Sequence, residues 1–212
     1  MVKVIMADDH PLVRAGMKYL LEETSDIKLQ GEAESGAGLI KKLREEAFDV
    51  VLMDLIMPGR SGIELLKQVK QEFPKLPVIV VSTYKEEMFA VRAIKAGASG
   101  YLCKDNAATE LVSAIRRVAE GGLFISPEVA SMMAEMLQGG ESEERSLTAL
   151  SDREYQILLM LAKDMNVSEV ADLLCISGKT VSTYKARIKI KLGLKTNADI
   201  IRFAQRHDLV ET

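Results

Sequence analysis

Polar residues stand at the ends of several apolar runs, where an uncompensated buried carboxylate would be costly. Asp8 and Asp9 follow the run VKVIMA, and Asp54 ends the run DVVLMD. The Ser82 hydroxyl and the Lys104 ammonium end two later runs in the same way. If these runs are neighbouring parallel strands, about 5 Å apart, their ends share one edge of a sheet and their side chains can converge on one ion.

Carboxylate oxygens without a Cys or a His-rich cluster favour magnesium, with water completing the octahedron. In such a site Asp54 would attack a phosphoryl group as a carboxylate nucleophile and form an acyl phosphate. Mg²⁺ held by Asp9 and Asp54, with help from Asp8 and the main-chain carbonyl of Ile56, would neutralise the phosphoryl oxygens. Lys104 would pair with another of those oxygens.

Ser82 could donate a hydrogen bond to the new phosphate, and its movement would give Tyr101 room to rotate inward. Each residue also has an ordinary interpretation: Asp54 as a turn residue, Lys104 as a surface lysine. Their joint placement at strand ends favours the phosphoryl-transfer site. His10, next to the acids and before a proline, is interpreted as a helix-entry residue rather than a ligand.

The elements that would position these residues alternate between strand and amphipathic helix, a pattern typical of a parallel α/β sheet. Strands are predicted at residues 2–7, 27–33, 49–54, 77–82 and 100–103. In the first helix, apolar residues recur at helical spacing, namely Leu12, Ala15, Gly16, Tyr19 and Leu20.

After this α/β region the pattern becomes helical. Ser126 and Pro127 predict the start of a linker helix, and residues 139–146, which are Gly-rich and acidic, predict a mobile hinge. The predicted domains are therefore 1–120, a linker and hinge over 121–147, and 148–212.

The last domain is predicted to contain only helices. Capping boxes start two of them, Ser151 to Glu154 and Thr196 to Asp199. A short helix, a tight turn at Ile176 and a longer helix with Ser177 as N-cap make a helix-turn-helix candidate.

The longer helix, residues 178–192, contains basic residues and no acidic one. Val181, Tyr184, Ile188 and Leu192 recur at helical spacing and are predicted to face inward. A solvated charged face is the ordinary interpretation, but the lack of acidic residues favours DNA in the major groove. The predicted DNA contacts are Lys179, Thr180, Ser182, Thr183, Lys185, Ala186, Arg187 and Lys189.

Composition agrees with two different halves. Residues 1–147 contain 18 Lys and Arg against 23 Asp and Glu, whereas residues 148–212 contain 10 against 8, so the halves are expected to have different partners. No apolar run reaches the roughly 20 residues of a membrane span. Asp8 and Asp9 come too early for a signal peptide, which predicts a cytoplasmic protein, and Cys103 and Cys175 are interpreted as reduced, buried thiols.

Residues 1 to about 120 resemble a response-regulator receiver domain, through the motifs ADDHP, VLMDLIMPGRSG, VVST and GYLCKD. The resemblance implies a flavodoxin-like five-stranded sheet of order 2-1-3-4-5, a partner histidine kinase and a short-lived phospho-aspartate. Two residues depart from the common pattern. Asp105 follows Lys104 where many receivers have a proline, often in cis, and Ile56 is apolar, which we hypothesise slows the approach of hydrolytic water.

Residues 148–212 resemble the LuxR/GerE-type helix-turn-helix of the NarL/FixJ regulators, through LSDRE, SEVADLL, ISGKTVSTY and KLG. TVSTYKARI is most similar to the BvgA and EvgA branch, and Asp164 and Val167 depart from the usual turn residues. The family's last helix mediates dimers on DNA. The resemblance thus implies an interface, and packing against the preceding helix is the alternative for the same residues, Ile200, Ile201, Ala204 and Leu209.

Together these features predict a phosphorylation-controlled transcription factor that binds promoter DNA as a homodimer. An aspartate-nucleophile phosphatase is one alternative, but such enzymes commonly place a second Asp where this chain has Ile56. A regulator whose DNA binding needs no phosphate is another, and the complete acidic cluster disfavours it.

Overall fold

The chain divides into two units, Met1–Leu137 and Gln138–Thr212. The computed structural model describes residues 1–57, 62–83, 87–137, 147, 149–207 and 209. The predicted hinge, residues 139–146, lies outside the described residues. None of the helices in the described ranges is both long and apolar enough to cross a membrane.

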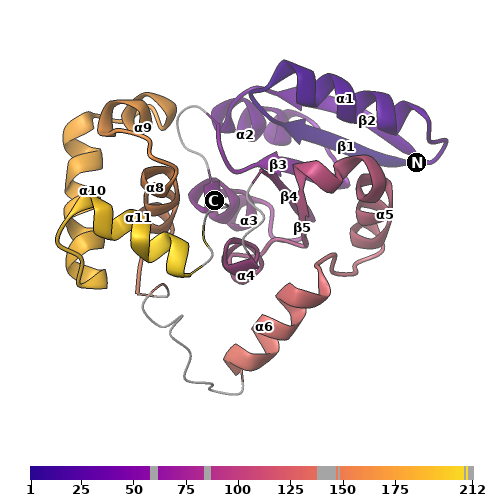
Figure 1. The fold of residues 1–212 in the computed structure, drawn as a ribbon. Coiled ribbons are helices and arrows are strands. Elements are labelled where there is room, and N and C mark those ends of the chain that lie inside the picture. Colours follow the sequence, from indigo (N-terminus) through magenta and orange to yellow (C-terminus); the bar gives the residue numbers. More distant parts are fainter. Residues whose placement is uncertain (58–61, 84–86, 138–146, 148, 208, 210–212) are drawn as a thin grey trace. The chain divides into compact units, whose positions relative to one another are not determined.

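The first unit is built on one parallel sheet in the order β2-β1-β3-β4-β5 (Figure 1). Its strands are β1 (Val2–Ala7), β2 (Ile27–Ala33), β3 (Val50–Asp54), β4 (Val78–Ser82) and β5 (Gly100–Cys103). Every residue of β3 and β4 is buried, as expected of central strands covered on both faces. The predicted fold class and strand order are confirmed.

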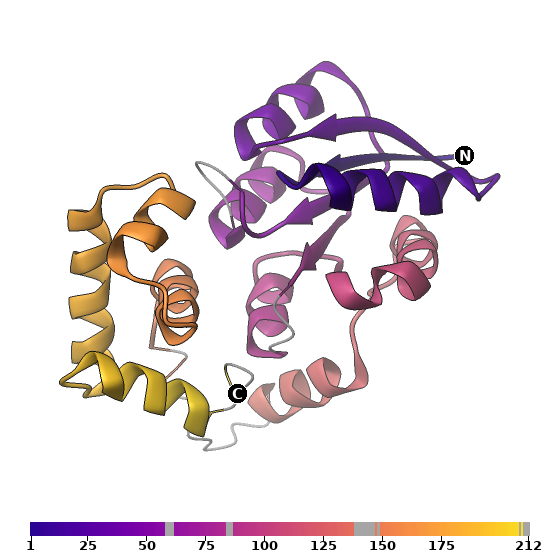
Figure 2. The ribbon, with the colours of Figure 1, turned by 45° about the horizontal axis from the view of Figure 1, so that its top comes forward.

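Helices cover both faces of this sheet (Figures 1 and 2). Helices α1 and α5 share one apolar core with the strands, while α2, α3 and α4 lie on the opposite face. The bounds are α1 (Pro11–Glu22), α2 (Gly36–Glu45), α3 (Gly62–Glu72), α4 (Glu87–Lys95), a 3-10 turn at Lys104–Asn106, and α5 (Ala107–Ala119).

Of the apolar residues that recur at helical spacing on α1, Leu20 packs against the core, but the others are exposed, namely Leu12, Ala15, Gly16 and Tyr19. Leu12 and Tyr19 are 86% and 64% exposed, whereas Met17 and Leu21 are buried and Val13 packs against the core. Two stripes on this helix are apolar, and the one displaced by a single residue fills the space against the sheet. Spacing alone does not distinguish them.

The predicted linker helix is present as α6 (Pro127–Leu137), and Ser126 Oγ accepts a hydrogen bond from the Val129 amide (3.3 Å). Before it, Phe124 extends the sheet edge, because its carbonyl accepts from the Tyr101 amide (3.0 Å). Helix α6 then packs on α4. The sheet edge and the linker helix thus form one continuous structure.

The second unit contains α8 (Asp152–Ala162), α9 (Val167–Leu173), α10 (Gly178–Leu192) and α11 (Asn197–Arg206). Both predicted capping boxes are present, and a third, from Asn166 to Glu169, starts α9. Asp164 and Cys175 adopt φ of 61° and 50° in the turns on either side of α9, a backbone region that glycine adopts without strain. This conformation explains why a glycine at the position of Asp164 would be the easier choice.

Neither cysteine is in a disulfide, as expected. The expectation that both thiols are buried is wrong, because Cys103 is only partly buried and Cys175 is exposed. Cys175 lies in the turn between α9 and α10, away from the core that the helices share.

Candidate functional site

Lys104 lies between two buried carboxylates at the carboxyl edge of the sheet. Its Nζ is 2.8 Å from Asp8 Oδ2 and 2.7 Å from Asp54 Oδ2. Asp8 follows β1, Asp54 ends the neighbouring β3, and both are at most 3% exposed. The parallel strands place these residues at one edge, so side chains about fifty residues apart meet there.

The acidic residues also form a cluster that fits a metal ion. Ligand atoms of Asp8, Asp9, His10 and Asp54 all lie within 4.8 Å of one another. Asp9 Oδ1 is buried and makes no hydrogen bond of acceptable geometry, although His10 Nδ1 is 3.0 Å away. A buried carboxylate oxygen without a hydrogen-bond donor is costly, and a cation would relieve that cost. The donor set, mostly carboxylate oxygen, suits a hard divalent ion.

His10 was expected to be a helix-entry residue. It precedes α1 as its N-cap, and its side chain makes no capping hydrogen bond. Instead its Nδ1 lies 3.2 Å from Asp8 Oδ1, and its amide donates to the same oxygen (2.8 Å). His10 therefore both starts the helix and helps to orient Asp8.

Burial and the ion pairs shift the pKa values of Asp54 and Lys104 in this site. Burial raises the pKa of the Asp54 carboxyl, although Lys104 and the Ile56 amide, 3.1 Å from Asp54 Oδ1, act in the opposite direction. Burial alone would lower the pKa of Lys104, but the ion pairs with Asp54 and Asp8 outweigh it and raise that pKa. We conclude that Lys104 stays charged and that an ionised Asp54 is energetically costly here. The role of the Ile56 carbonyl as a ligand stays a prediction.

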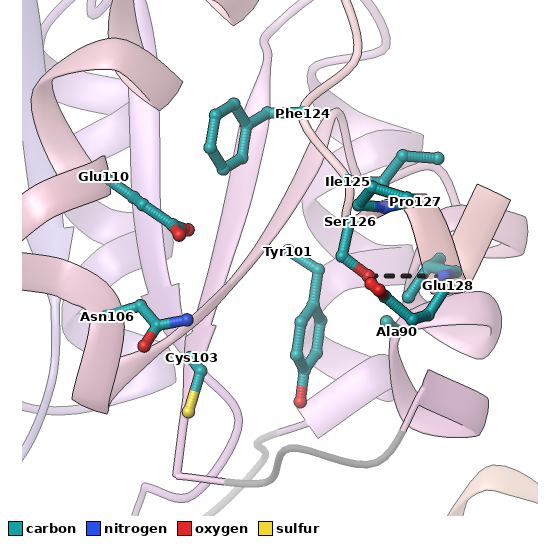
Figure 3. A pocket seen from close by; sticks show the side chains of 11 residues that line it. Ala90, Tyr101, Cys103, Asn106, Glu110, Phe124, Ile125, Ser126, Pro127 and Glu128 are labelled. Atoms are coloured by element: carbon teal, nitrogen blue, oxygen red, sulfur yellow. Dashed lines mark hydrogen bonds between the residues drawn. The ribbon is translucent and has the colours of Figure 1, made fainter.

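Ser82 and Tyr101 occupy the adjoining strands. Ser82 ends β4, is fully buried and lies opposite Cys103 in β5. Figure 3 shows Tyr101 and Cys103 on the same side of β5, lining a pocket of about 430 Å³ that Ala90 and the start of α6 also line. Tyr101 packs with the apolar cluster of α4 and α6. Movement of Tyr101 coupled to Ser82 stays a prediction.

The peptide after Lys104 is trans, since the described residues contain no cis peptide bond. The departure at Asp105 therefore does not prevent Lys104 from reaching the acids.

The second candidate site is the outward surface of α10. Val181 and Ile188 are fully buried, as predicted, whereas Tyr184 and Leu192 are only partly buried. Of the predicted DNA contacts, the exposed ones are Lys179, Ser182, Thr183, Ala186 and Arg187, and the partly buried ones are Thr180, Lys185 and Lys189.

Two features of α10 were not expected. Lys191 Nζ pairs with the buried Glu154 of α8 (2.6 Å), so this lysine joins two helices. Ile190 is 80% exposed and lies on the outward surface. This exposure could not be predicted from the sequence, because an apolar residue in a periodic helix is usually buried.

The residues considered for a dimer interface lie mostly inside the unit. Ile200, Ala204 and Leu209 are buried and Ile201 is partly buried. Helix α11 packs against α8. Burial favours the packing alternative for Ile200, Ala204 and Leu209, and the main helix that α11 contacts is α8.

Comparisons with known proteins follow the same division of the chain. Residues 4–116 match the family described as "Response regulator receiver domain", and residues 148–204 match "Bacterial regulatory proteins, luxR family". The Response regulator GacA of Pseudomonas aeruginosa is 38% identical over 211 residues, covering 100% of this chain and 99% of that protein.

Two solved structures of RcsB are also similar. RcsB from Salmonella enterica serovar Typhimurium, bound to a promoter in the presence of the phosphomimetic BeF3−, has a TM-score of 0.70 and 29% identity, covering 97% of this chain and 98% of that one. A structure of two RcsB dimers bound to two parallel DNAs has a TM-score of 0.60 and 28% identity, covering 96% and 98%. The narrower likeness to BvgA and EvgA stays a prediction.

Proposed function

Because the chain belongs to the response regulators that join a receiver domain to a luxR-family DNA-binding domain, we propose that phosphorylation of Asp54 controls its binding to promoter DNA. The contacts of Lys104 with Asp8 and Asp54 support this assignment most directly. They place a fixed ammonium beside the carboxylate that would accept the phosphoryl group.

In the proposed reaction Asp54 attacks the phosphorus of a phosphohistidine in a partner histidine kinase. A phosphorus–oxygen bond forms as the phosphorus–nitrogen bond breaks, and the histidine leaves with its electron pair. Asp8, Asp9 and Asp54 would hold a Mg²⁺ ion, which would neutralise charge on the phosphoryl oxygens. Lys104 then holds one of those oxygens in place of its contact with Asp54.

The output is DNA binding through the outward surface of α10. Its exposed Lys179 and Arg187 and its small residues Ser182 and Ala186 fit the major groove, where basic side chains meet phosphates and small ones reach base edges. Phosphorylation would shift the population toward a homodimer on paired half-sites, and a coupling of about 1–3 kcal/mol suffices. The dimers and promoter complex of RcsB support this arrangement.

No observation favours a phosphatase. Ile56 stands where such enzymes commonly carry a general acid, and GacA, whose match covers the whole chain, is a response regulator. If Ile56 slows hydrolytic water, Ile56→Asn should shorten the life of the acyl phosphate. A lifetime of seconds in both proteins would contradict this.

The test is phosphorylation with acetyl phosphate and Mg²⁺, followed by DNA selection with phosphorylated and unphosphorylated protein. Asp54→Asn should abolish the label and leave the fold intact, and a label that persists on another residue would refute the assignment. Equal DNA affinity for wild type and Asp54→Ala would instead show that binding needs no phosphate.

The DNA surface is tested separately with Lys185→Ala and Lys189→Ala. Each should weaken binding to all sequences and reduce the salt dependence by about one phosphate contact. Binding that keeps both its affinity and its salt slope would place α10 away from the DNA backbone.

A further inference from the structure

Ile190 is the most exposed large apolar residue in the described part of the second unit. Its exposed fraction is 80%, whereas Leu173, the other exposed one there, reaches 38%. A single exposed aliphatic side chain is common on protein surfaces, so the significance of Ile190 depends on which residues share its side of a helix with no acidic residue.

The position of Ile190 on the helix places it with the predicted DNA contacts. At 100° per residue, Ile190 lies about 20° around the helix from Thr183 and about 40° from Ala186. It lies roughly opposite Val181 and Ile188, which are buried. The three outward residues thus form a line about 10 Å long, from the 1.5 Å rise per residue.

This line is apolar despite the threonine in it. Thr183 Oγ1 donates to the Lys179 carbonyl (2.9 Å), so the hydroxyl is turned toward the helix backbone. The methyl groups of Thr183 and Ala186 and the side chain of Ile190 remain on the outside. We call these three residues the apolar stripe. Lys179 and Arg187 are both exposed. At 100° per residue, Lys179 lies in line with the stripe, one turn before Thr183, and Arg187 lies beside it.

A partner of the apolar stripe must combine negative charge at its edges with apolar groups at its centre. The major groove of DNA has this composition, because phosphates line it and the thymine 5-methyl is the apolar group on its floor. Base pairs rise 3.4 Å, so a line of about 10 Å spans about three base-pair steps.

Building on the proposed function, we propose that the apolar stripe reads thymine methyl groups and that Ile190 is a specificity-determining residue. The half-site is then expected to contain thymines at positions facing the stripe. The hydrogen-bonding residue Ser182 lies at the edge of this surface. Specificity would therefore come in large part from methyl contacts rather than from hydrogen bonds.

The experiment uses the full chain and an operator obtained by selection. Each thymine in a half-site is replaced in turn by deoxyuridine, which lacks only the methyl group, and Kd is measured. Burying one methyl is worth about 0.8 kcal/mol, or about fourfold in Kd. For the wild-type protein, Kd should rise about fourfold when a contacted thymine is replaced, and replacement of a thymine outside the half-sites should leave Kd unchanged.

The variants form a double-mutant cycle. Ile190→Ala should weaken binding several-fold and remove the deoxyuridine penalty at one position, whereas Ile190→Leu should retain most of both. Leu173→Ala, on α9, is the matched control, and its Kd should rise on each deoxyuridine replacement as it does for the wild type.

Two results would overturn the assignment. One is an unchanged set of deoxyuridine penalties in Ile190→Ala. The other is loss of dimerisation in that variant without any sensitivity to thymine methyls, which would assign the stripe to a second copy of the chain. If wild-type protein binds no DNA in either phosphorylation state, the proposed function itself fails, and that result is distinguishable from both.

Discussion

Replacing Lys104 with methionine should destabilise the first unit, and Mg²⁺ should offset part of that loss. The side chain keeps its length but loses the ammonium that bridges Asp8 and Asp54 at 2.8 and 2.7 Å. Both carboxylates are at most 3% exposed, so water cannot replace the lost partner. Breaking a buried ion pair in this way costs about 3–5 kcal/mol.

We expect a loss near the lower bound, about 3 kcal/mol, because the acids lie at the sheet edge. For a unit of this size that is roughly 10 °C in Tm. A divalent ion at a hundred times its Kd stabilises the folded state by about 2.7 kcal/mol. Because the variant site carries one more uncompensated negative charge, Mg²⁺ should stabilise Lys104→Met more than the wild type and narrow the gap.

Hydrogen exchange of the β1, β3 and β5 amides, with EDTA or with millimolar Mg²⁺, measures this loss for the first unit alone. Lys70→Met is the matched control, since Lys70 is partly buried and its Nζ donates to the Leu76 carbonyl (2.8 Å). Lys70→Met should lose less stability than Lys104→Met, and Mg²⁺ should stabilise it no more than it stabilises the wild type. Equal losses in both variants, with equal Mg²⁺ responses, would refute the view that Lys104 neutralises the acids.

Three further predictions concern the second unit. Asp164→Gly should raise the free energy of unfolding by roughly 1 kcal/mol, measured in urea, because it relieves a left-handed backbone. Glu154→Gln should lower it by about 1.5–3 kcal/mol in the same assay, because it removes the charge that Lys191 contacts at 2.6 Å. Hydrogen bonds from Thr196 lower the pKa of Asp199 to about 2. The stabilisation of α11 by the ionised Asp199 should therefore be complete above about pH 4 and lost as the pH falls toward 2, and NMR of the α11 amides should detect this loss. In Asp199→Asn this pH dependence should be absent.

The convergence of Asp8, Asp54 and Lys104 could be predicted from the sequence because it follows from topology. Parallel strands joined by helices all run the same way, so residues that end them share an edge whatever their separation in the chain. The apolar runs of β3 and β4 likewise identified central strands. The strand order itself came from the family resemblance, since strand patterns do not say which strands are neighbours.

The errors arose where two patterns were equally apolar or where a side chain's partner lay elsewhere in the chain. On α1, Leu12 and Val13 each begin an apolar stripe, and only packing decides between them. On α10, the run of lysines does not indicate that Lys191 forms an ion pair with the buried Glu154 of α8. The exposure of Ile190 was not predicted, because an isoleucine in a periodic helix is usually interpreted as a core residue.

The charges around Lys104 show why a phosphoryl group would act as a switch here. Asp8, Asp9 and Asp54 with one ammonium leave a charge of about −2, which one divalent cation neutralises. Phosphorylation replaces the single negative charge of the Asp54 carboxylate by a charge of about −2 on the phosphoryl group. The site therefore gains negative charge among buried residues. Nearby hydrogen-bond donors must then turn toward the phosphate. The hydroxyl of Ser82 is fully buried at the end of the adjacent strand, and we predict that its reorientation carries that charge change to Tyr101 on β5.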